Sequence, residues 1–338
     1  MRRVVIQRHH STLELRGLLW QHRDAMQQYL SAPLPSASEI DAFCAELANS
    51  FTTNEYVVSF APYQEHTRHI AVRHLDNQRF VVFRPLHAQP HVPAEGVFHA
   101  LWQPSPFVRR APLLVHLPGY GAGFSLFPEA QTGGYQVLHV SPLGYVTAAG
   151  RQSQLQRDGV WPVMLETVET EGLRGYRTML QQILAATAWA LQQPAVDTSA
   201  VGFFGTSQGG GLSLLMASIL RDRLRSVVVA HLPFLTSFVD APDGGSYELA
   251  KKALSYSPRP EAAAHALLHF DTLAHAHRLD MPVLLTSGGQ DKLCPAASAR
   301  KLFDRLPGIR ALLETPSQGH VYTPEALRLT LMWFDLYL

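Results

Sequence analysis

Ser207 stands among glycines directly after an apolar stretch, in the segment Gly-Thr-Ser-Gln-Gly at 205–209. This segment matches the pattern G-x-S-x-G, with an expected strand before it (200–205) and a helical sequence after it. In that context the strand-to-helix turn is so tight that side chains at Gly205 and Gly209 would collide with neighbouring chain, and it holds the serine hydroxyl out for nucleophilic attack. The alternative is a plain glycine-rich loop, which the flanking strand and helix disfavour.

A serine hydroxyl is a weak nucleophile without a general base, and the base needs an orienting acid. For a serine on such a turn the order along the chain is Ser, then Asp or Glu, then His. His320 is the only histidine after Asp291, and each of these two residues follows an expected strand. We therefore predict a catalytic triad of Ser207, Asp291 and His320.

Asp271, Asp280 and Asp304 also lie between Ser207 and His320 and are rival acids. Asp280 precedes its strand and Asp304 lies in an expected helix, so neither should reach the catalytic edge of the sheet. Asp271 lies in the expected cap and is the weakest of the three exclusions.

The oxyanion of an acyl-transfer intermediate needs two N–H donors. One expected donor is Gln208, which follows the nucleophile, with the helix N-terminus adding partial positive charge. The other is Tyr120, in the glycine-rich segment at 116–123 after the expected strand 112–117. The alternative for this segment is a glycine-rich turn that binds nothing.

These residues need a sheet to position them, and the sequence supplies short apolar strands alternating with helical segments. Near-continuous apolar strands of this kind predict a parallel sheet covered on both faces. The clearest helix covers 173–193. The expected parallel strands are 112–117, 135–140, 200–205, 226–232, 282–288 and 310–316.

The first hundred residues follow a different pattern. Residues 12–30 have helical spacing, with Ser11 and Glu14 placed to form a capping box, and a second helix is expected at 38–50. Period-two segments then predict antiparallel strands. The expected antiparallel strands are 69–75 and 79–84, which form a hairpin, and 97–102.

We therefore predict an N-terminal helical extension at 1–54 packed on a hydrolase domain at 55–338. The segment 233–280 is too long for a simple crossover and is expected to form a cap over the site.

The composition excludes several classes of function. The 338 residues are 46% hydrophobic and 16% charged, with a formal net charge of +1, so no electrostatic case exists for nucleic acid or an anionic membrane. No apolar stretch approaches the ~20 residues that span a bilayer, and the N-terminus lacks the apolar core of a signal peptide. A cytoplasmic location is the simplest interpretation.

Metal binding is a weaker hypothesis. Two histidine groups invite it, but neither has accompanying cysteines or an H-E-x-x-H helix, and the two cysteines form no metal or redox motif. Cys294 could be proposed as a nucleophile, but a buried small hydrophobe fits it better. We predict no metal and no cofactor. The histidine groups are His66, His69 and His74, and His87, His91 and His99.

The segment at 205–218 resembles the nucleophile segment of the acetyl xylan esterase/cephalosporin C deacetylase family, in which Ser-Gln-Gly-Gly-Gly is typical. The segments at 231–241 and 270–299 are similar to that family's Pro-Phe-Leu and acid regions, and the similarity covers about 112–325. The resemblance implies an α/β-hydrolase fold, the removal of acetyl groups from sugar or cephalosporin hydroxyls, Asp291 as the acid, and a homo-oligomer, hexameric with active sites facing an enclosed space.

Two positions depart from the family. Ser-Pro-Leu-Gly-Tyr at 141–145 replaces the usual Arg-Gly-Gln, and Val321 replaces the usual Glu after the histidine. The triad and both oxyanion positions remain, so the chemistry is expected to survive while the acetyl preference transfers less safely. Trp161, in the long insertion that follows, and Phe234 are candidate substrate contacts; an exposed aromatic packing on the cap is the alternative for Trp161.

The sequence thus predicts a serine esterase that removes small acyl groups, with acetyl expected, from a sugar-like or other small alcohol through an acyl-enzyme. Two alternatives stay open. One is a serine peptidase of the prolyl-oligopeptidase kind, for which the N-terminal ~100 residues are too few to form a propeller. The other is a non-catalytic scaffold with this fold, although such proteins usually lose a triad member.

Overall fold

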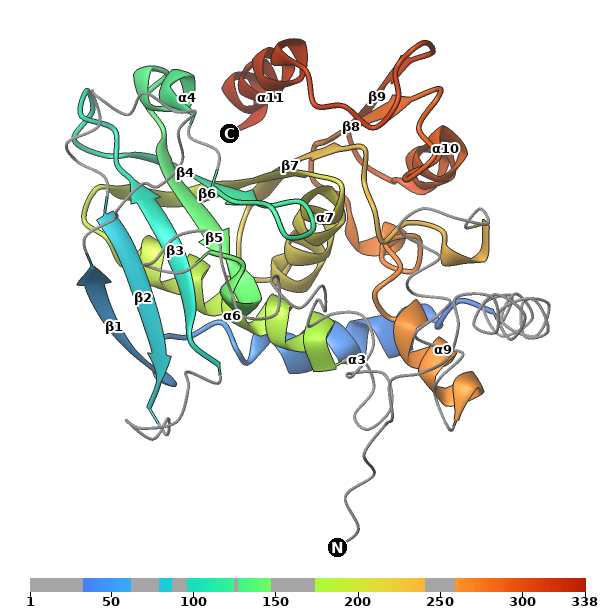
Figure 1. Ribbon diagram of the computed structural model, residues 1–338, viewed down its shortest axis with the longest axis horizontal. Helices are drawn as coiled ribbons and strands as arrows, with labels where there is room; N and C mark the ends of the chain where they lie inside the picture. Colours follow the sequence, from blue (N-terminus) through green and yellow to red (C-terminus); the bar gives the residue numbers. More distant parts are fainter. Residues whose placement is uncertain (1–32, 62–78, 87–95, 125–126, 147–173, 241–258) are drawn as a thin grey trace, which may run out of the picture.

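The computed structural model describes residues 33–61, 79–86, 96–124, 127–146, 174–240 and 259–338. Their strands form one nine-stranded sheet in the order β1-β2-β3-β5-β4-β6-β7-β8-β9 (Figure 1). Pairs up to β3–β5 are antiparallel, and pairs from β5–β4 to β8–β9 are parallel. The predicted mostly parallel sheet with antiparallel N-terminal strands is therefore confirmed. The strands are β1 (Tyr56–Ala61), β2 (Arg79–Pro85), β3 (Phe98–Gln103), β4 (Ala111–Leu117), β5 (Gln136–Ser141), β6 (Val196–Thr206), β7 (Ser226–His231), β8 (Val283–Gly288) and β9 (Arg310–Thr315).

Helices lie on both sides of this sheet (Figure 1). One layer contains α6 and α7, with α3 packed against both of them. The opposite side carries α4, which packs on β5, and α11, which packs on β7 and β8. The described helices are α3 (Ala37–Ala48), α4 (Pro128–Thr132), α6 (Arg174–Leu191), α7 (Gln208–Leu220), α9 (Pro260–Leu268), α10 (Ala296–Arg305) and α11 (Pro324–Tyr337), with short 3₁₀ turns η1 (Pro142–Gly144), η2 (Phe238–Asp240) and η3 (Ala276–Arg278).

The central strands are apolar on both faces because both faces are covered. Neighbouring residues of β6 show this: Phe203 packs into the core cluster under α6 and α7, and Phe204 packs into the cluster under α4 and α11. The same division holds for Leu113 and Leu114 on β4. A strand with one face in water would instead alternate apolar and polar side chains. The prediction that the near-continuous apolar runs form strands covered on both faces is therefore confirmed.

The helix α3 begins with a capping box formed by Ser36 and Glu39. The Ser36 hydroxyl accepts from the backbone N–H of Glu39, and the Glu39 carboxylate accepts from the backbone N–H of Ser36, which forms a capping box. Ile40, Phe43 and Leu47 then share one buried face. The expected helix at 38–50 is confirmed as α3.

The structure differs from the sequence expectations at the N-terminal edge of the sheet. β2 pairs antiparallel with β3 on one side and with β1 on the other, and β1 was not predicted from the sequence. Its burial alternates only weakly, since it is the edge strand and one side of it is open to solvent. The expected partner strand at 69–75 and the expected helix at 12–30 lie outside the described residues.

Among the described residues, no helix combines the length and the apolar character needed to span a membrane.

Candidate active site

Ser207 occupies a sharp turn between β6 and α7. Its backbone has φ 59° and ψ −122°, a conformation that costs free energy for a residue with a side chain. The turn is fastened on both sides, because the Ser207 N–H donates to the His231 carbonyl at 2.9 Å and the Ser207 carbonyl accepts from the Phe234 N–H at 2.9 Å. The Ser207 side chain makes no cap hydrogen bond to α7, although it stands at the N-cap position. The hydroxyl is therefore not committed to the helix that it precedes.

The glycines around Ser207 are sterically required. A Cβ at Gly205 or Gly209 would overlap the carbonyl oxygen of Leu117 at the end of β4. A Cβ at Gly210 would lie 2.9 Å from the His231 carbonyl oxygen, closer than real Cβ contacts allow. The expected collisions at 205 and 209 are confirmed, and they come from the backbone of neighbouring segments, which cannot move aside easily.

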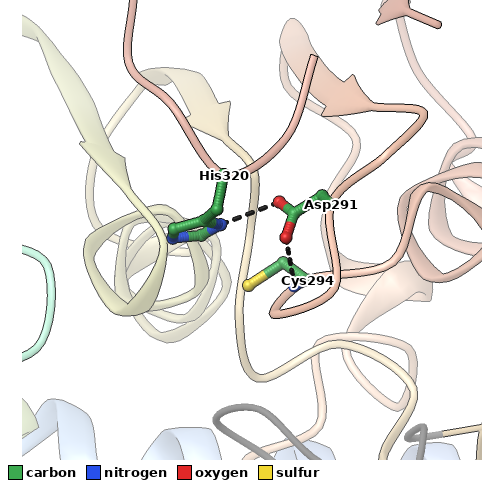
Figure 2. A group of neighbouring side chains, drawn as sticks. All are labelled: Asp291, Cys294 and His320. Carbon is green, nitrogen blue, oxygen red and sulfur yellow. Dashed lines mark hydrogen bonds and ion pairs between the residues drawn. The ribbon is translucent and has the colours of Figure 1, made fainter. Parts of the chain in front are cut away.

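The structure brings Asp291 and His320 together. Nδ1 of His320 lies 2.7 Å from Oδ2 of Asp291, in a pair whose carboxylate is fully buried and whose imidazole is 21% exposed (Figure 2). The other carboxylate oxygen, Oδ1, accepts from the backbone N–H groups of Leu293 and Cys294, each at 2.8 Å. These bonds fix the carboxylate, so Oδ2 is presented to the ring. The second ring nitrogen points away from Asp291 (Figure 2).

Cys294 connects this pair to the serine. Its thiol lies near the Ser207 side chain, and it lies within 4.8 Å of ligand atoms of both Asp291 and His320. Ser207, Asp291 and His320 follow β6, β8 and β9, and the carboxyl ends of parallel strands share one edge of a sheet. The three residues of the predicted triad therefore lie at one edge of the sheet, and Asp291 and His320 are in hydrogen-bond contact there. Burial and the neighbouring Asp291 raise the pKa of the Cys294 thiol, which makes it a poor nucleophile.

The loop after β4 crosses the serine turn. A Cβ built on Gly119 would lie 3.9 Å from Cβ of Ser207, and Gly121 has a φ of 62°, which favours glycine. Tyr120 lies between them and is half-buried, with its ring centroid 6.2 Å from that of Tyr145. Gln208 is the first residue of α7. Both predicted oxyanion donors are thus on segments that adjoin Ser207.

The residues that depart from the family pattern also lie at this site. Tyr145, after the η1 turn, is buried and donates a hydrogen bond to Oε1 of Gln208 at 3.2 Å. The Tyr176 hydroxyl from α6 also lies near the Gln208 amide, so this amide is enclosed by two tyrosines. Burial raises the pKa of both phenols, which stay neutral. The contact with Tyr145 was not visible in sequence, because it joins the end of β5 to the start of α7. Val321 beside His320 is 59% exposed.

The rival acids are engaged elsewhere. Asp271 is fully buried, and its carboxylate accepts from the N–H groups of Ser237, Phe238 and Leu273 at 2.7–2.9 Å. Asp280 pairs with Arg221 at 2.7 Å, and Asp304 lies in α10. Asp271 therefore holds the segment after β7 in place and does not contact His320.

Of the remaining candidate residues, Phe234 and His99 lie in the described part of the chain. Phe234 is buried and packs on Phe238, and its backbone N–H donates to the Ser207 carbonyl. His99 is buried and stacks on Phe80, with ring centroids 5.0 Å apart. Outside the described residues lie Trp161, His66, His69, His74, His87 and His91.

Solved structures with the same architecture define the class as the α/β-hydrolase fold. Acetyl xylan esterase 1 from Thermoanaerobacterium sp. JW/SL YS485 superimposes with a TM-score of 0.67 at 18% identity, covering 93% of this chain and 98% of that one. An acetyl xylan esterase from Paenibacillus sp. R4 gives a TM-score of 0.66 at 19% identity, covering 93% and 99%. Acylaminoacyl peptidase from Pyrococcus horikoshii gives 0.56 at 17% identity, covering 72% of this chain and 40% of that one. At these identities the likeness shows the fold alone.

The acetyl xylan esterase family model matches residues 95–333. The chain belongs to the acetyl xylan esterase family, a family of serine carboxylic-ester hydrolases. The acetyl esterase Axe7A from Xylanibacter ruminicola is 27% identical over 142 residues, which is 41% of this chain and 31% of that protein. The match therefore spans less than a third of this relative.

Proposed function

We propose that this protein is a serine esterase that removes small acyl groups, acetyl above all, from a sugar-like or other small alcohol. The observation that carries the proposal is the hydrogen bond between His320 and Asp291 at the sheet edge that also holds Ser207. Membership of the acetyl xylan esterase family supports the ester as substrate. The names of the similar proteins, acetyl esterase and acetyl xylan esterase, support acetyl as the acyl group.

In the proposed reaction the His320 imidazole takes the proton of the Ser207 hydroxyl, and Ser207 attacks the ester carbonyl. The backbone N–H groups of Tyr120 and Gln208 donate to the oxyanion, and the N-terminus of α7 adds partial positive charge. His320 then protonates the leaving alcohol and activates the water that releases the acid. Asp291 orients the ring through Nδ1 and stabilises its charged form.

The Asp291 carboxylate suits this role because its other oxygen is already satisfied. Two backbone N–H groups hold Oδ1, so the carboxylate cannot rotate away from the ring. A fixed carboxylate keeps the His320 ring in one orientation, which favours proton transfer from the Ser207 hydroxyl.

The pocket for the alcohol is proposed to differ from the family pattern, because Ser-Pro-Leu-Gly-Tyr at 141–145 stands where the family usually has Arg-Gly-Gln. Leu143 has a φ of 54°, and its N–H donates to Oε1 of Gln182 at 2.8 Å, so the turn is firmly held. An apolar side chain on a fixed turn favours a less polar alcohol. Trp161 and Phe234 remain proposed substrate contacts. The cap at 233–280, the cytoplasmic location and the homo-oligomer also stay predictions.

The test is hydrolysis of p-nitrophenyl acetate, butyrate and octanoate by the wild type, Ser207→Ala and Ser199→Ala. Ser199 is an exposed serine near the amino end of β6, the strand that Ser207 follows. We expect a steep fall in kcat/KM beyond acetate, with activity lost in Ser207→Ala and kept in Ser199→Ala. A preference for octanoate would contradict the small acyl group. Equal rates for Ser207→Ala and the wild type would contradict the nucleophile.

A further inference from the structure

Three side chains of kinds that bind metal ions, a carboxylate, a thiol and an imidazole, lie close together near Ser207. One ligand atom from each of Asp291, Cys294 and His320 lies within 4.8 Å of the other two, and this is the one such group found among the described residues (Figure 2). The carboxylate and the thiol are buried, and the imidazole is partly exposed. The proposed ester hydrolysis uses the carboxylate and the imidazole but assigns no task to the thiol.

The donor set matches the preferences of a thiophilic divalent cation. Zinc takes thiolate, imidazole and carboxylate ligands in tetrahedral sites, and sites with three protein ligands leave a fourth position open. The Ser207 side chain lies near the Cys294 thiol, and its hydroxyl is a nearby oxygen for that fourth position. Soft thiolate ligands also disfavour Mg²⁺ and Ca²⁺, which prefer oxygen.

The distances require only a local rearrangement. Ligand atoms around tetrahedral zinc lie roughly 3.3 Å apart for N and O donors, because the metal–ligand bonds are about 2.0–2.1 Å. Nδ1 of His320 and Oδ2 of Asp291 are 2.7 Å apart, so an ion entering between them replaces their hydrogen bond. A small rotation of the ring, which is 21% exposed, supplies the extra space.

We propose that Asp291, Cys294 and His320 form an inhibitory binding site for a thiophilic divalent cation such as Zn²⁺ or Cd²⁺. Binding replaces the thiol proton of Cys294 with a bond to the ion, and this proton passes to solvent. His320 binds through Nδ1 as the neutral ring, whose single proton then stands on Nε2. No oxidation or reduction takes place. An ion held in this way removes His320 and Asp291 from their proposed work on Ser207, so it acts as an inhibitor and not as a cofactor. The inhibitory effect rests on the proposed function; the binding does not.

The chain contains its own control for this proposal. Cys44 is the second cysteine, and its Sγ lies 3.7 Å from Nδ1 of the buried His275 and 3.6 Å from Oγ of Ser218. It is therefore buried beside an imidazole, as Cys294 is. No carboxylate joins that pair to make a third ligand within the described part of the chain. Loss of Cys44 should leave tight ion binding unchanged.

The experiment measures Cd²⁺ binding by calorimetry and by the ultraviolet charge-transfer band of a cadmium thiolate, with the wild type, Cys294→Ala, Cys294→Ser and Cys44→Ala. We expect the wild type and Cys44→Ala to show the band and to bind alike. Both Cys294 variants should lose the band and bind at least tenfold more weakly. Two substitutions at 294 are used so that a folding defect in one, seen by thermal unfolding, does not decide the result. Unchanged binding or an unchanged band in a folded Cys294 variant would overturn the proposal.

Ser207→Ala separates this proposal from the proposed function. The variant should keep the charge-transfer band, since a water can take the place of the hydroxyl, although it is expected to have no esterase activity. Loss of the band in folded Ser207→Ala would contradict the proposed site. If wild-type activity with p-nitrophenyl acetate is present, Cd²⁺ should inhibit the wild type and Cys44→Ala at concentrations at least tenfold lower than those needed for Cys294→Ala. Equal inhibition of these proteins would count against the site.

Discussion

Nδ1 of His320 lies 2.7 Å from Oδ2 of Asp291, although the two residues are 29 positions apart and follow different strands of the sheet. The partner oxygen of the same carboxylate accepts from two backbone N–H groups of its own loop. The acid is thus held by the loop after β8, and the base by the loop after β9. We therefore expect substitution of Asp291 to lower activity and substitution of the buried Asp271 to lower stability.

Asp291→Asn should lower kcat on p-nitrophenyl acetate by about 10²–10⁴-fold, because an amide cannot stabilise the imidazolium and favours the wrong tautomer of His320. The stability should change little, since an amide oxygen can still accept from Leu293 and Cys294. Steady-state kinetics and thermal unfolding on the same preparation check both parts. A loss of kcat below tenfold would show that Asp291 is not the orienting acid.

Asp271→Asn should have the opposite profile. Its carboxylate accepts three backbone N–H bonds in a fully buried position, so an amide would place its NH₂ against one of those donors. We expect a loss of about 2–4 kcal/mol in the free energy of unfolding, because a buried donor loses its acceptor. Esterase activity of the folded fraction should stay within about threefold of wild type. A stable Asp271→Asn protein with the kinetic defect predicted for Asp291→Asn would make Asp271 the acid.

Gly209→Ala should destabilise the fold although it replaces a helical glycine. Helix propensity alone would make alanine more stable by about 1 kcal/mol. The added Cβ would overlap the Leu117 carbonyl oxygen, so the expected net change is a loss of about 3 kcal/mol. Gly119→Ala is the matched control, because its Cβ would meet no atom closer than 3.5 Å. Urea unfolding should separate the two variants by more than 2 kcal/mol, and a stabilised Gly209→Ala would refute the packing described at this turn.

Stability should fall as the pH is lowered below about 6.5, the ordinary pKa of histidine. Burial lowers the pKa of His116 and His231 to about 3 and that of His99 and His275 to about 4, and it lowers the pKa of His139 well below its usual value. Between pH 6.5 and these values the unfolded chain binds more protons than the folded one, so stability rises with pH across this window. Burial raises the pKa of Asp271 to about 6, which makes stability fall as the pH rises. This single group is outweighed by the five buried histidines.

Urea unfolding at pH 5.0, 6.0 and 7.5 measures this dependence. His99→Phe, which keeps a ring to stack on Phe80, should reduce the slope between pH 5.0 and 6.0 by up to one proton, or about 1.4 kcal/mol per pH unit. Above pH 7 the slopes of the two proteins should agree. A wild-type stability that is flat or that rises toward pH 5.0 would contradict the neutral burial of these histidines.

Much of the sheet and the order of the site residues could be predicted from sequence. Apolar runs such as 226–232 can only be strands covered on both faces, and Asp291 and His320 each follow such a run. Strand β1 was missed because an edge strand buries only part of one face, so its apolar pattern is weak. Its Tyr56, Val58 and Phe60 do repeat at period two, which was the available signal.

The contacts that join distant segments could not be predicted. The hydrogen bond from Tyr145 to Gln208 depends on how closely the end of β5 approaches the start of α7, and no local pattern encodes that distance. The approach of the Cys294 thiol to Ser207 depends on the turn in which Asp291 accepts from the N–H groups of residues 293 and 294. The spacing of Asp291 and Cys294, three residues apart, was the available signal for this turn. That spacing does not indicate that the turn lies beside Ser207.

The most direct test of the central claim, that Ser207 is the nucleophile, is to identify the residue that a p-nitrophenyl alkylphosphonate modifies. Such a compound phosphonylates an activated serine and releases p-nitrophenol, and peptide mass spectrometry locates the adduct. We expect the phosphonyl mass on the peptide containing Ser207, loss of esterase activity in step with labelling, and no labelling of Ser207→Ala. An adduct on another residue that abolishes activity, or full activity after Ser207 is completely labelled, would contradict the claim.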